Sequence, residues 1–532
     1  MRSSLCNSKN SAKELAYLAG DTGNLPSTIN GALLLTELLL FGLNRSAMSL
    51  ALYNTLSRRK EAFKTLVPNQ VKMYCCGVTV YDYCHLGHAR SYIVWDTIRR
   101  YLSWRGYDVR YVQNFTDIDD KILNRARQEQ SSMQAVAEEY TAAYFEDMAR
   151  LNVLEADEYT YATHTIDGIK RLIHELEQKG FAYSAAGDVY YSVRKFEGYG
   201  KLSGRKLEDM QAGASGRVDA DKEKQTKQDP FDFALWKSAK AGEPSWESPW
   251  GAGRPGWHIE CSAMVRDRLG DTIDIHVGGA DLQFPHHENE IAQSEAATGQ
   301  PLATYWMHNG MVNVDGEKMS KSLGNFTTIR GLLDAPEGPS PMAIRMFVLQ
   351  SQYRMPLDFT PETIEAAKNG WDTLNDGLSF GTRHGKSLGW SDGEVDLDEL
   401  EESAVQKFQA SMDDDFNTPG AIAILFGLAK ELQRQGNLII HEGKPDADPA
   451  ALQRQWQTLV SLAQVLGLEA QDKAVEQPEE GLSDAEIDAL VEQRTAAKQS
   501  KDYATADRIR NELNAAGITL IDKPGGVAVW HR

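Results

Sequence analysis

The sequence predicts an α/β protein of several domains, and three observations lead to that prediction. Its 532 residues exceed the roughly 100 to 200 residues of one domain. Short apolar strand candidates alternate with helical segments over the first two-thirds of the chain, as in a parallel sheet. Beyond Pro361, helical segments with long polar connections follow. We therefore expect a parallel-sheet body with an insertion, then an α-helical bundle and a small mixed α/β unit.

The composition is that of a globular protein from a reducing compartment. Apolar residues make up 42% of the chain and charged residues 25%. The net charge of -20 does not attract nucleic acid over a wide area, so any such site must be a local patch. Five cysteines are too sparse for a disulfide scaffold, and no segment reaches the ~18 to 20 apolar residues of a membrane span. We expect a cytoplasmic protein with no membrane or DNA partner.

Residues 1–47 differ from the rest of the chain, being rich in Ser and Asn at their start and then apolar. We expect Met48 to be the natural start, so that residues 1–47 form an N-terminal extension that need not be translated. The alternative is an organelle transit peptide. The early serines favour it, and the acids Glu14, Asp21 and Glu37 weaken it, because transit peptides are poor in acids.

Residues 48–124 are predicted to form the first half of the sheet body. Residues 71–76 are a strand candidate, and residues 77–88 are a turn that carries glycine and histidine. Apolar residues then recur at helical spacing, at Val94, Ile98, Tyr101 and Leu102. A second strand is expected at residues 109–112, which completes a strand, helix and strand order.

The remaining domain boundaries are placed where the pattern of apolar and polar residues changes along the chain. Residues 125–245 hold amphipathic helices and the polar loop 213–228, and we interpret them as a connective insertion. The second half of the body is expected at 246–332, with strands at 273–277 and 310–314, followed by a junction at 333–360. The helical bundle is expected at 361–470 and the small unit at 471–532. In the small unit we expect helices 484–500 and 503–516 and a strand pair at 517–522 and 526–530.

His85-Leu86-Gly87-His88 lies between a predicted strand and the start of a predicted helix. In an open parallel sheet, ligands bind beyond the carboxyl ends of the strands, and a helix N-terminus offers N–H groups to phosphate. Two histidines there could contact ATP, and Gly87 would let a nucleotide approach the backbone closely. The alternative is that both histidines cap the helix or lie on the surface.

A second motif, Lys318-Met319-Ser320-Lys321-Ser322, follows a predicted strand. Two ammonium groups three residues apart suit a loop that closes on a polyphosphate and stabilises its charge. The alternative for this motif alone is a solvated basic loop. Together the two motifs resemble the signatures of class I aminoacyl-tRNA synthetases.

Four side chains form a candidate zinc set. Cys76 ends the first predicted strand, Cys261 lies about 185 residues later, and a helix opened by Pro285 places His286 and Glu290 on one face. Two thiolates, one imidazole and one carboxylate are usual zinc donors. The alternative for each cysteine alone is a buried apolar filler.

Three acids, Asp117, Asp119 and Asp120, follow the second predicted strand. They could form a Mg²⁺ cluster, or they could cap the loop and pair with Lys121, so we assign them no site.

From Met48 to the C-terminus the chain resembles the cysteinyl-tRNA synthetases. The resemblance rests on Tyr81 and Asp82 and on residues 116–121, 245–264 and 278–290. It implies a class I Rossmann-like parallel-sheet catalytic domain with an inserted connective domain, an α-helical anticodon-binding bundle and a small C-terminal mixed α/β RNA-binding domain. That family commonly has Ile where this chain has Leu86, a change of similar apolar bulk.

The resemblance also implies roles for the motif residues. In that family one zinc ion, held by the residues that match Cys76, Cys261, His286 and Glu290, binds the thiolate of the substrate. The residue that matches Trp257 lines the side-chain pocket. ATP, with Mg²⁺, would be held by Gly87, Asp281 and Lys321, with catalytic contacts from His85, His88, Lys318 and Lys321.

The implied activity has two steps. The cysteine carboxylate attacks the α-phosphate of ATP to give cysteinyl-adenylate and pyrophosphate, and the cysteinyl group then passes to a ribose hydroxyl of tRNA(Cys). Serine differs from cysteine by one atom, and an apolar pocket separates such near-isosteres by only ~1 to 3 kcal/mol. A metal that binds sulfur can exceed this, so we assign residues 125–245 no proofreading role.

The C-terminal unit is expected to contact RNA. Residues 501–532 hold 5 basic and 4 acidic side chains, whereas residues 391–480 hold 6 basic and 19 acidic ones. Positive charge beside an aromatic ring suits unpaired bases. The candidate residues are Arg508, Arg510, Lys523, Trp530 and Arg532, although Trp530 is equally consistent with a core position.

Two other functions remain open from the sequence. One is a cysteine ligase with the same catalytic domain that acts on an amino-sugar acceptor, and the other is an RNA-binding module with a structural zinc. The roughly 170 residues beyond Pro361 argue against the first. The presence of both nucleotide motifs, and a carboxylate among the ligands, argue against the second.

Overall fold

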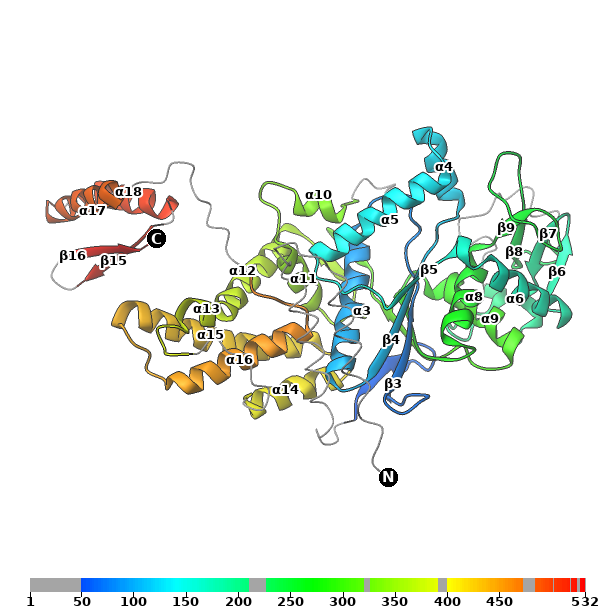
Figure 1. Cartoon of the computed structure of the whole chain (residues 1–532), viewed down its shortest axis with the longest axis horizontal. Helices are drawn as coiled ribbons and strands as arrows, with labels where there is room; N and C mark the ends of the chain where they lie inside the picture. The colour runs from blue at the N-terminus through cyan, green and yellow to red at the C-terminus, as the bar shows by residue number, and fades with distance from the viewer. Residues whose placement is uncertain are drawn as a thin grey trace, which may run out of the picture.

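The computed structural model describes residues 49–209, 226–319, 326–390, 400–471, 484–500, 502–516, 518–523 and 527–531. The predictions for residues 1–47, most of the loop 213–228, Lys321 and Arg532 lie outside the described residues. Figure 1 shows a sheet-based body, a helical bundle beside it and a small unit at the C-terminal end. Among the described helices, none is long and apolar enough to cross a membrane.

A five-stranded parallel sheet forms the centre of the body and confirms the predicted fold class. Its order is β11-β10-β3-β4-β5. The strands are β3 (Gln70–Cys75), β4 (Asp108–Phe115), β5 (Glu158–Tyr161), β10 (Ile273–Gly279) and β11 (Ala303–Asn309). Met73 and Tyr74 point to opposite faces of β3 and both are fully buried, because both faces of the sheet are covered. The predicted helix after β3 is α3 (Leu86–Trp104).

Two strands of the sheet have no counterpart in the sequence prediction. β5 lies within residues 125–245, the predicted insertion, yet Tyr159 pairs with Gln113 of β4. Its sequence, Glu-Tyr-Thr-Tyr, is short and carries too few aliphatic residues to stand out. β11 pairs along its length with β10 and carries His308 and Asn309 at its carboxyl end. The central sheet therefore takes strands from both halves of the body and from the range between them.

The range between the two halves also forms most of a second sheet, whose last strand lies beyond the predicted boundary at residue 245. Helices α4 (Asp120–Glu129) and α5 (Met133–Arg150) precede β5, and α6 (Ile166–Gln178) follows it. An antiparallel sheet then has the order β6-β7-β8-β9. Its strands are β6 (Ala182–Ala185), β7 (Asp188–Tyr191), β8 (Phe233–Ser238) and β9 (Gly253–Pro255). Its core includes Tyr191 and Trp236 and is shared with α8 (Trp257–Leu269) and α9 (Glu288–Thr298), so this region supports the site helices directly.

Two smaller groups of strands flank the central sheet. β1 (Ala51–Asn54) and β2 (Arg59–Ala62) form a hairpin. The predicted strand at 310–314 is the shorter β12 (Val312–Val314), which pairs with β13 (Glu317–Lys318) and β14 (Leu357–Phe359). Helices α10 (Ile329–Leu333) and α11 (Pro341–Leu349) lie between β13 and β14 in the chain. The β12-β13 hairpin therefore leads directly into the second motif.

The predicted helical bundle begins at Pro361. Its helices are α12 (Pro361–Leu378), α13 (Phe380–His384), α14 (Glu402–Asp413), α15 (Thr418–Glu442) and α16 (Pro449–Val465). Thr360 caps α12 and Asp448 caps α16, and each helix has proline at its first position, a common helix start. The buried core of the bundle is continuous with that of the body, so the two are packed together (Figure 1).

A buried ionic network joins the body to the bundle. Arg345 of α11 pairs with Asp96 of α3, and Arg100 Nε lies 2.9 Å from Asp96 Oδ2. Arg345 Nε also donates to the carbonyl of Leu466, just after α16, at 2.7 Å. Burial raises the pKa of Asp96, but the charges of Arg100 and Arg345 outweigh it and hold that pKa below its usual value. The network thus keeps an ionised carboxylate at the junction of three helices.

The C-terminal unit has the predicted two helices and strand pair. They are α17 (Asp484–Gln499), α18 (Tyr503–Ala515), β15 (Thr519–Lys523) and β16 (Val527–His531). Ile487, Ile509 and Leu513 are fully buried in its core. Trp530 packs against this core, and its Nε1 donates to Asp488 Oδ1 at 2.7 Å. Of the two interpretations of Trp530, the structure favours the core position.

Candidate active site and metal centre

The site is built where the order of the central sheet reverses. From β3 the chain runs outward through β4 to β5, and it returns to β10 and β11 on the other side of β3. Ligands of open parallel sheets bind beyond the carboxyl ends of the strands at such a point. Cys76 follows β3 directly and Asp281 follows β10 by two residues. The reversal therefore places the predicted metal and nucleotide residues at one edge of the sheet, the edge formed by the carboxyl ends of its strands.

The four predicted zinc ligands meet at this edge and are buried. One donor atom from each of Cys76, Cys261, His286 and Glu290 lies within 4.8 Å of the others. Cys76 Sγ is 3.8 Å from Cys261 Sγ and 3.3 Å from Glu290 Oε1. His286 Nε2 is 3.1 Å from the same Oε1. The predicted one-turn spacing is confirmed, although α9 begins at Glu288 and His286 lies in the preceding short helix η5 (Gln283–His287).

The geometry of this set fits a zinc ion. Two sulfur ligands, each about 2.3 Å from a tetrahedral zinc, stand about 3.8 Å apart, which is the separation of the two cysteine sulfurs. His286 Nδ1 is 3.0 Å from His258 Nδ1, so the Nε2 atom is the one turned toward the cluster. A hydrogen bond to the second ring nitrogen is how proteins orient a metal-ligating histidine.

The charges in the cluster also suit a metal. The hydrogen bond with Cys76 lowers the pKa of the Cys261 thiol to about 6. Burial acts against a charged His286, but the Glu290 carboxylate raises its pKa to about 9. Burial also raises the pKa of Glu290, but His276 and His286 hold it well below its usual range. Burial raises the pKa of Cys76 well above its usual value, so binding a metal would release a proton from Cys76 and another from His286.

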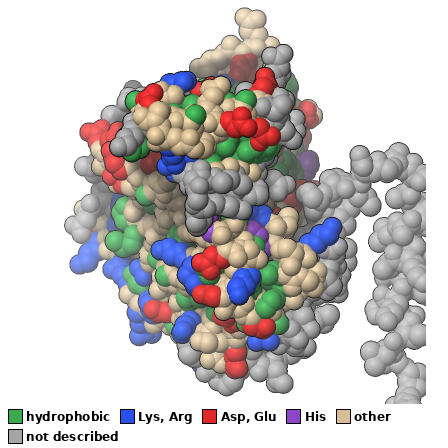
Figure 2. Space-filling model, turned by 90° about the vertical axis from the view of Figure 1, so that its left-hand side faces the viewer, with side chains coloured by type: hydrophobic (Ala, Val, Ile, Leu, Met, Phe, Trp, Pro, Cys, Tyr) green, Lys and Arg blue, Asp and Glu red, His purple; other side chains and the backbone are tan. Residues whose placement is uncertain are grey.

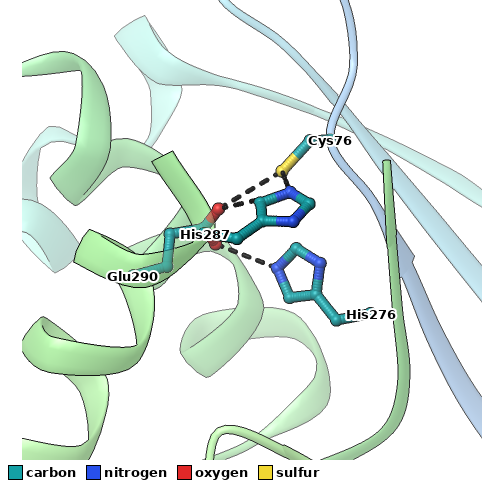
Figure 3. Close-up of side chains that lie close together, drawn as sticks. All are labelled: Cys76, His276, His287 and Glu290. Carbon is teal, nitrogen blue, oxygen red and sulfur yellow. Dashed lines mark hydrogen bonds and ion pairs between the residues drawn. The ribbon is translucent and has the colours of Figure 1, made fainter. Parts of the chain in front are cut away.

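A second, overlapping donor set has no counterpart in the sequence prediction. Figure 3 shows Cys76 and Glu290 together with His276 of β10 and His287 of η5. His276 Nε2 is 2.9 Å from Glu290 Oε2, and His287 Nε2 is 3.3 Å from Cys76 Sγ. Because the first set offers two sulfur atoms and the second only one, zinc chemistry favours the first.

His287 of the second set and its neighbour His308 lie beside the first set as buried, neutral rings. His287 Nδ1 is 2.8 Å from His308 Nε2. Burial lowers the pKa of His287 well below its usual value and that of His308 to about 3. Neutral rings that contact Cys76 and Glu290 can orient these ligands. The signal in the sequence was His276 itself, a histidine between Ile275 and Val277 in a strand of the sheet, where a buried polar residue needs a partner.

Trp257 lies beside the cluster, as the family resemblance implies. It is the first residue of α8, and its ring stacks on that of His286 with centroids 4.1 Å apart and 24° between the planes. A Cβ on the preceding Gly256 would lie 2.0 Å from the carbonyl oxygen of Ala234 in β8. Only glycine permits this approach, so the second sheet fixes where Trp257 stands.

The two histidines of the first motif cap α3. His85 Nδ1 accepts from the His88 N–H, and His88 Nδ1 accepts from the His85 N–H, both at 3.3 Å. Their rings stack with centroids 3.6 Å apart. The helix-capping alternative is therefore confirmed, and the same geometry holds both rings at the positive end of the helix dipole. A phosphate group would find N–H donors and imidazoles together there.

The structure brings the second motif against the first. A Cβ on Gly87 would lie 2.9 Å from two ring atoms of His85 and 3.5 Å from Met319 Cε, so glycine leaves room for both. Leu86 N–H donates to Thr327 at 3.1 Å, which pairs the chain beyond the second motif with the start of α3. The backbone of Lys318 ends β13. Its side chain and all of Lys321 lie outside the part that the structure describes.

Asp281 and the acids after β4 have different surroundings. Asp281 is exposed beyond β10, and its Oδ1 would lie 2.5 Å from a Cβ on Gly279. Asp119 caps α4 through the Lys121 N–H at 2.9 Å, Asp117 accepts from Thr163 N–H at 3.0 Å, and Asp120 pairs with Arg254. Each acid after β4 thus has a protein partner, in line with the capping interpretation rather than a Mg²⁺ cluster.

Three families match successive parts of the chain. Residues 62–369 match the tRNA synthetases class I (C) catalytic domain, residues 407–471 match the DALR domain, and residues 481–529 match the cysteinyl-tRNA ligase anticodon binding domain. These matches follow the body, the later part of the bundle and the C-terminal unit in order.

Similar proteins agree with this result. The cysteine–tRNA ligases of Gloeothece citriformis and Trichodesmium erythraeum are 65% and 66% identical to this chain, over 91% of it and 100% of their own length. A methionyl-tRNA synthetase of Mycobacterium tuberculosis with methionyl-adenylate has a TM-score of 0.51 at 15% identity, covering 75% of this chain and 89% of its own. A leucyl enzyme of Agrobacterium radiobacter in a ternary complex has 0.53 at 13%, covering 76% and 85%. Those structures share the fold, and the identity of the sequence relatives shows that the chain belongs to the cysteinyl-tRNA synthetase family.

Proposed function

We propose that this chain, a ligase that forms an aminoacyl-tRNA, activates cysteine with ATP in a zinc-dependent manner and transfers it to tRNA(Cys). Membership of the family supports the ligase activity and implies cysteine, ATP and tRNA as substrates. The observation that carries the zinc dependence is the buried set Cys76, Cys261, His286 and Glu290 at the sheet reversal. A zinc ion held there would supply a soft Lewis acid for the cysteine thiolate.

Selection of cysteine over serine follows from the same set of residues. An apolar pocket alone separates the two side chains by ~1 to 3 kcal/mol. A sulfur-preferring centre separates them further, since a serine hydroxyl is a poorer ligand and is harder to ionise. Trp257, stacked on His286, would close the pocket over the substrate side chain and exclude water.

We assign ATP to the edge formed by the two motifs. His85, Gly87 and His88 would hold the triphosphate at the N-terminus of α3, where N–H groups and the helix dipole favour negative charge. Lys318 and Lys321 would stabilise the charge that develops on the polyphosphate with Mg²⁺, and Asp281 would accept from the ribose. The reaction needs little acid or base catalysis, because positioning and charge stabilisation dominate phosphoryl and nucleotidyl transfer.

The bundle and the C-terminal unit would bind tRNA(Cys). The anticodon-binding match at residues 481–529 supports this, and Arg508 and Arg510 are exposed on α18. Basic and acidic side chains are interspersed over the face drawn in Figure 2, so binding there would use local contacts rather than a broad positive surface. We place this reaction in the cytoplasm.

The amino-sugar alternative is not supported. It predicted a chain that ends soon after the catalytic domain, whereas matches to the DALR and anticodon binding domains continue to residue 529.

The test is Cys261→Ser in the full-length enzyme. We expect less bound zinc and a KM for cysteine that rises far more than the KM for ATP, because only the thiolate contact is lost. Metal analysis and cysteine-dependent pyrophosphate exchange measure the two effects. Cys75→Ser is the matched control, because Cys75 is buried beside Cys76 but lies outside the donor set. Unchanged zinc content in Cys261→Ser would contradict the ligand assignment.

A further inference from the structure

The turn between α14 and α15 of the bundle contacts the catalytic body through three consecutive acids, residues 413–415, which we name the aspartate loop. Asp413 Oδ1 accepts from the Tyr101 hydroxyl at 2.6 Å and pairs with Arg105, both at the C-terminal end of α3. Asp414 is exposed and pairs with Lys60 of β2. The contacts of Asp413 lie at the end of α3 opposite to the His85 and His88 cap.

Asp415 is the buried member of the aspartate loop and is surrounded by partners. Its side chain is fully buried. Oδ1 accepts from the Tyr53 N–H at 2.8 Å and from the Tyr353 hydroxyl at 3.0 Å. Oδ2 accepts from Arg354, at 2.9 Å from Nε and 2.7 Å from an Nη nitrogen. A carboxylate of the bundle thus binds β1 and the segment just before β14 at once.

The backbone of Asp415 is also held in an uncommon conformation. Its φ is 59°, and that of Phe416 is 51°, in the left-handed region that most side chains disfavour. Such a conformation persists when the surrounding contacts determine it, and it marks positions where geometry serves a function.

Tyr353 and Arg354 connect Asp415 to both nucleotide motifs. The Tyr353 carbonyl accepts from the Gly310 N–H at 2.8 Å, directly before the β12-β13 hairpin that leads to Lys318. It also accepts from Arg90 Nη2 at 3.1 Å. Arg90 lies in α3 two residues after His88 and donates to the Met311 carbonyl at 2.8 Å. Each of the two nucleotide motifs is therefore linked to the buried Asp415 carboxylate through a short series of direct contacts.

We infer that Asp415 is a positioning residue that aligns the two ATP motifs by fixing the segment that contains Tyr353 and Arg354 from the side of the bundle. Since this rests on the assignment of ATP to those motifs, it deepens the proposed function. The bundle belongs to the tRNA-binding part of the chain, so the alignment of the ATP site depends on how that part is docked.

The test compares Asp415→Asn and Arg354→Gln in the full-length, zinc-loaded enzyme. Asparagine keeps one acceptor oxygen, so its NH₂ group must replace the acceptor either to Arg354 or to Tyr53, and the negative charge that pairs with Arg354 is lost with little change of volume. We expect the KM for ATP in cysteine-dependent pyrophosphate exchange to rise about tenfold in each variant, as misplacement of catalytic groups does. Zinc content and the KM for cysteine should not change. The double variant should show less than the product of the two effects, because the residues act as one unit.

The control is Asp414→Asn, in the same turn but on the surface, which should leave the KM for ATP unchanged. A lower melting temperature in Asp415→Asn, with an unchanged KM for ATP in both Asp415→Asn and Arg354→Gln, would show a structural role only and overturn the inference. His88→Ala separates the two proposals. An unchanged KM for ATP in that variant would refute the ATP assignment itself, whereas a normal Asp415→Asn enzyme beside an impaired His88→Ala enzyme refutes the positioning role alone.

Discussion

At the scale of single residues, Cys75 and Cys76 show that two neighbouring cysteines can have different chemical roles. They are neighbours at the end of β3, so their side chains leave the strand in opposite directions. Cys76 lies in the donor set, while Cys75 packs in the larger apolar core. The family resemblance and the donor types predicted all four proposed ligands, whereas His276, His287 and His308 were missed because their role depends on contacts with Cys76, Glu290 and one another.

Cys75 and Cys84 should resist alkylation in the folded enzyme. Burial raises the pKa of the Cys75 thiol to about 12 and that of Cys84 well above its usual value. At pH 8 the reactive thiolate of Cys75 is then about 10⁻⁴ of the total, against roughly a quarter for a free cysteine. Peptide mass spectrometry after iodoacetamide treatment should find both residues unmodified in buffer and modified in urea. Rapid labelling in buffer would be inconsistent with these thiols being buried and protonated.

At the scale of elements, α3 joins the first motif to the bundle. Its predicted helical spacing is confirmed, and so are the strands predicted at 71–76, 109–112, 273–277 and, in shortened form, 310–314. β5 and the strands of the second sheet escaped prediction because most have four residues or fewer and take their stability from neighbouring strands. The sequence also offered no sign that Asp413 and Asp415, two acids in an acidic stretch, are buried in contact with the catalytic body.

Gly87→Ala should impair ATP use with little net change in the stability of α3. A methyl group at this position would lie 2.9 Å from the His85 ring and displace the stacked pair. Alanine is otherwise better than glycine inside a helix by roughly 0.5–1 kcal/mol. Disturbing the histidine cap costs about 0.5–2 kcal/mol, which offsets this gain. We therefore expect the KM for ATP to rise about tenfold while the melting temperature changes little. Pyrophosphate exchange and thermal unfolding measure these two quantities, and an unaltered KM would show that the histidine stack is not part of the ATP site.

At the scale of the whole molecule, the body and the bundle share one apolar core and the Arg345 network. The overall order of body, insertion, bundle and small unit could be predicted from changes in the residue pattern along the sequence. Their packing does not, because it depends on side chains that are far apart in the chain, such as Asp96 and Arg345.

Arg345→Met should destabilise the folded chain strongly. It leaves the buried Asp96 with Arg100 as its remaining cation and removes the donors to Leu466 and Leu151. Breaking a buried ion pair from one side costs about 3–5 kcal/mol. The midpoint of urea unfolding should fall accordingly. Arg383→Met, which breaks a more exposed pair with Asp376, should change it little, and equal effects of both substitutions would argue against the network.

Removal of the residues beyond 480 should separate the two steps of the reaction. Cysteine-dependent pyrophosphate exchange should remain largely intact, because the C-terminal unit has its own core. Charging of tRNA should weaken markedly. Pyrophosphate exchange and tRNA charging should be measured in parallel on the truncated and full-length chains. An equal loss of both activities would mean that this unit is structural.

The distance along the chain between Cys76 and Cys261 has a consequence for folding. Their sulfur atoms are 3.8 Å apart, yet 185 positions separate them. The unfolded chain does not hold two segments so far apart in one place, so an ion that needs both would bind only the folded form. It would then raise the stability of the folded chain by mass action. The atoms that recognise the substrate would then also stabilise the fold, so that an enzyme that has lost the ion would be both less able to select cysteine and easier to unfold.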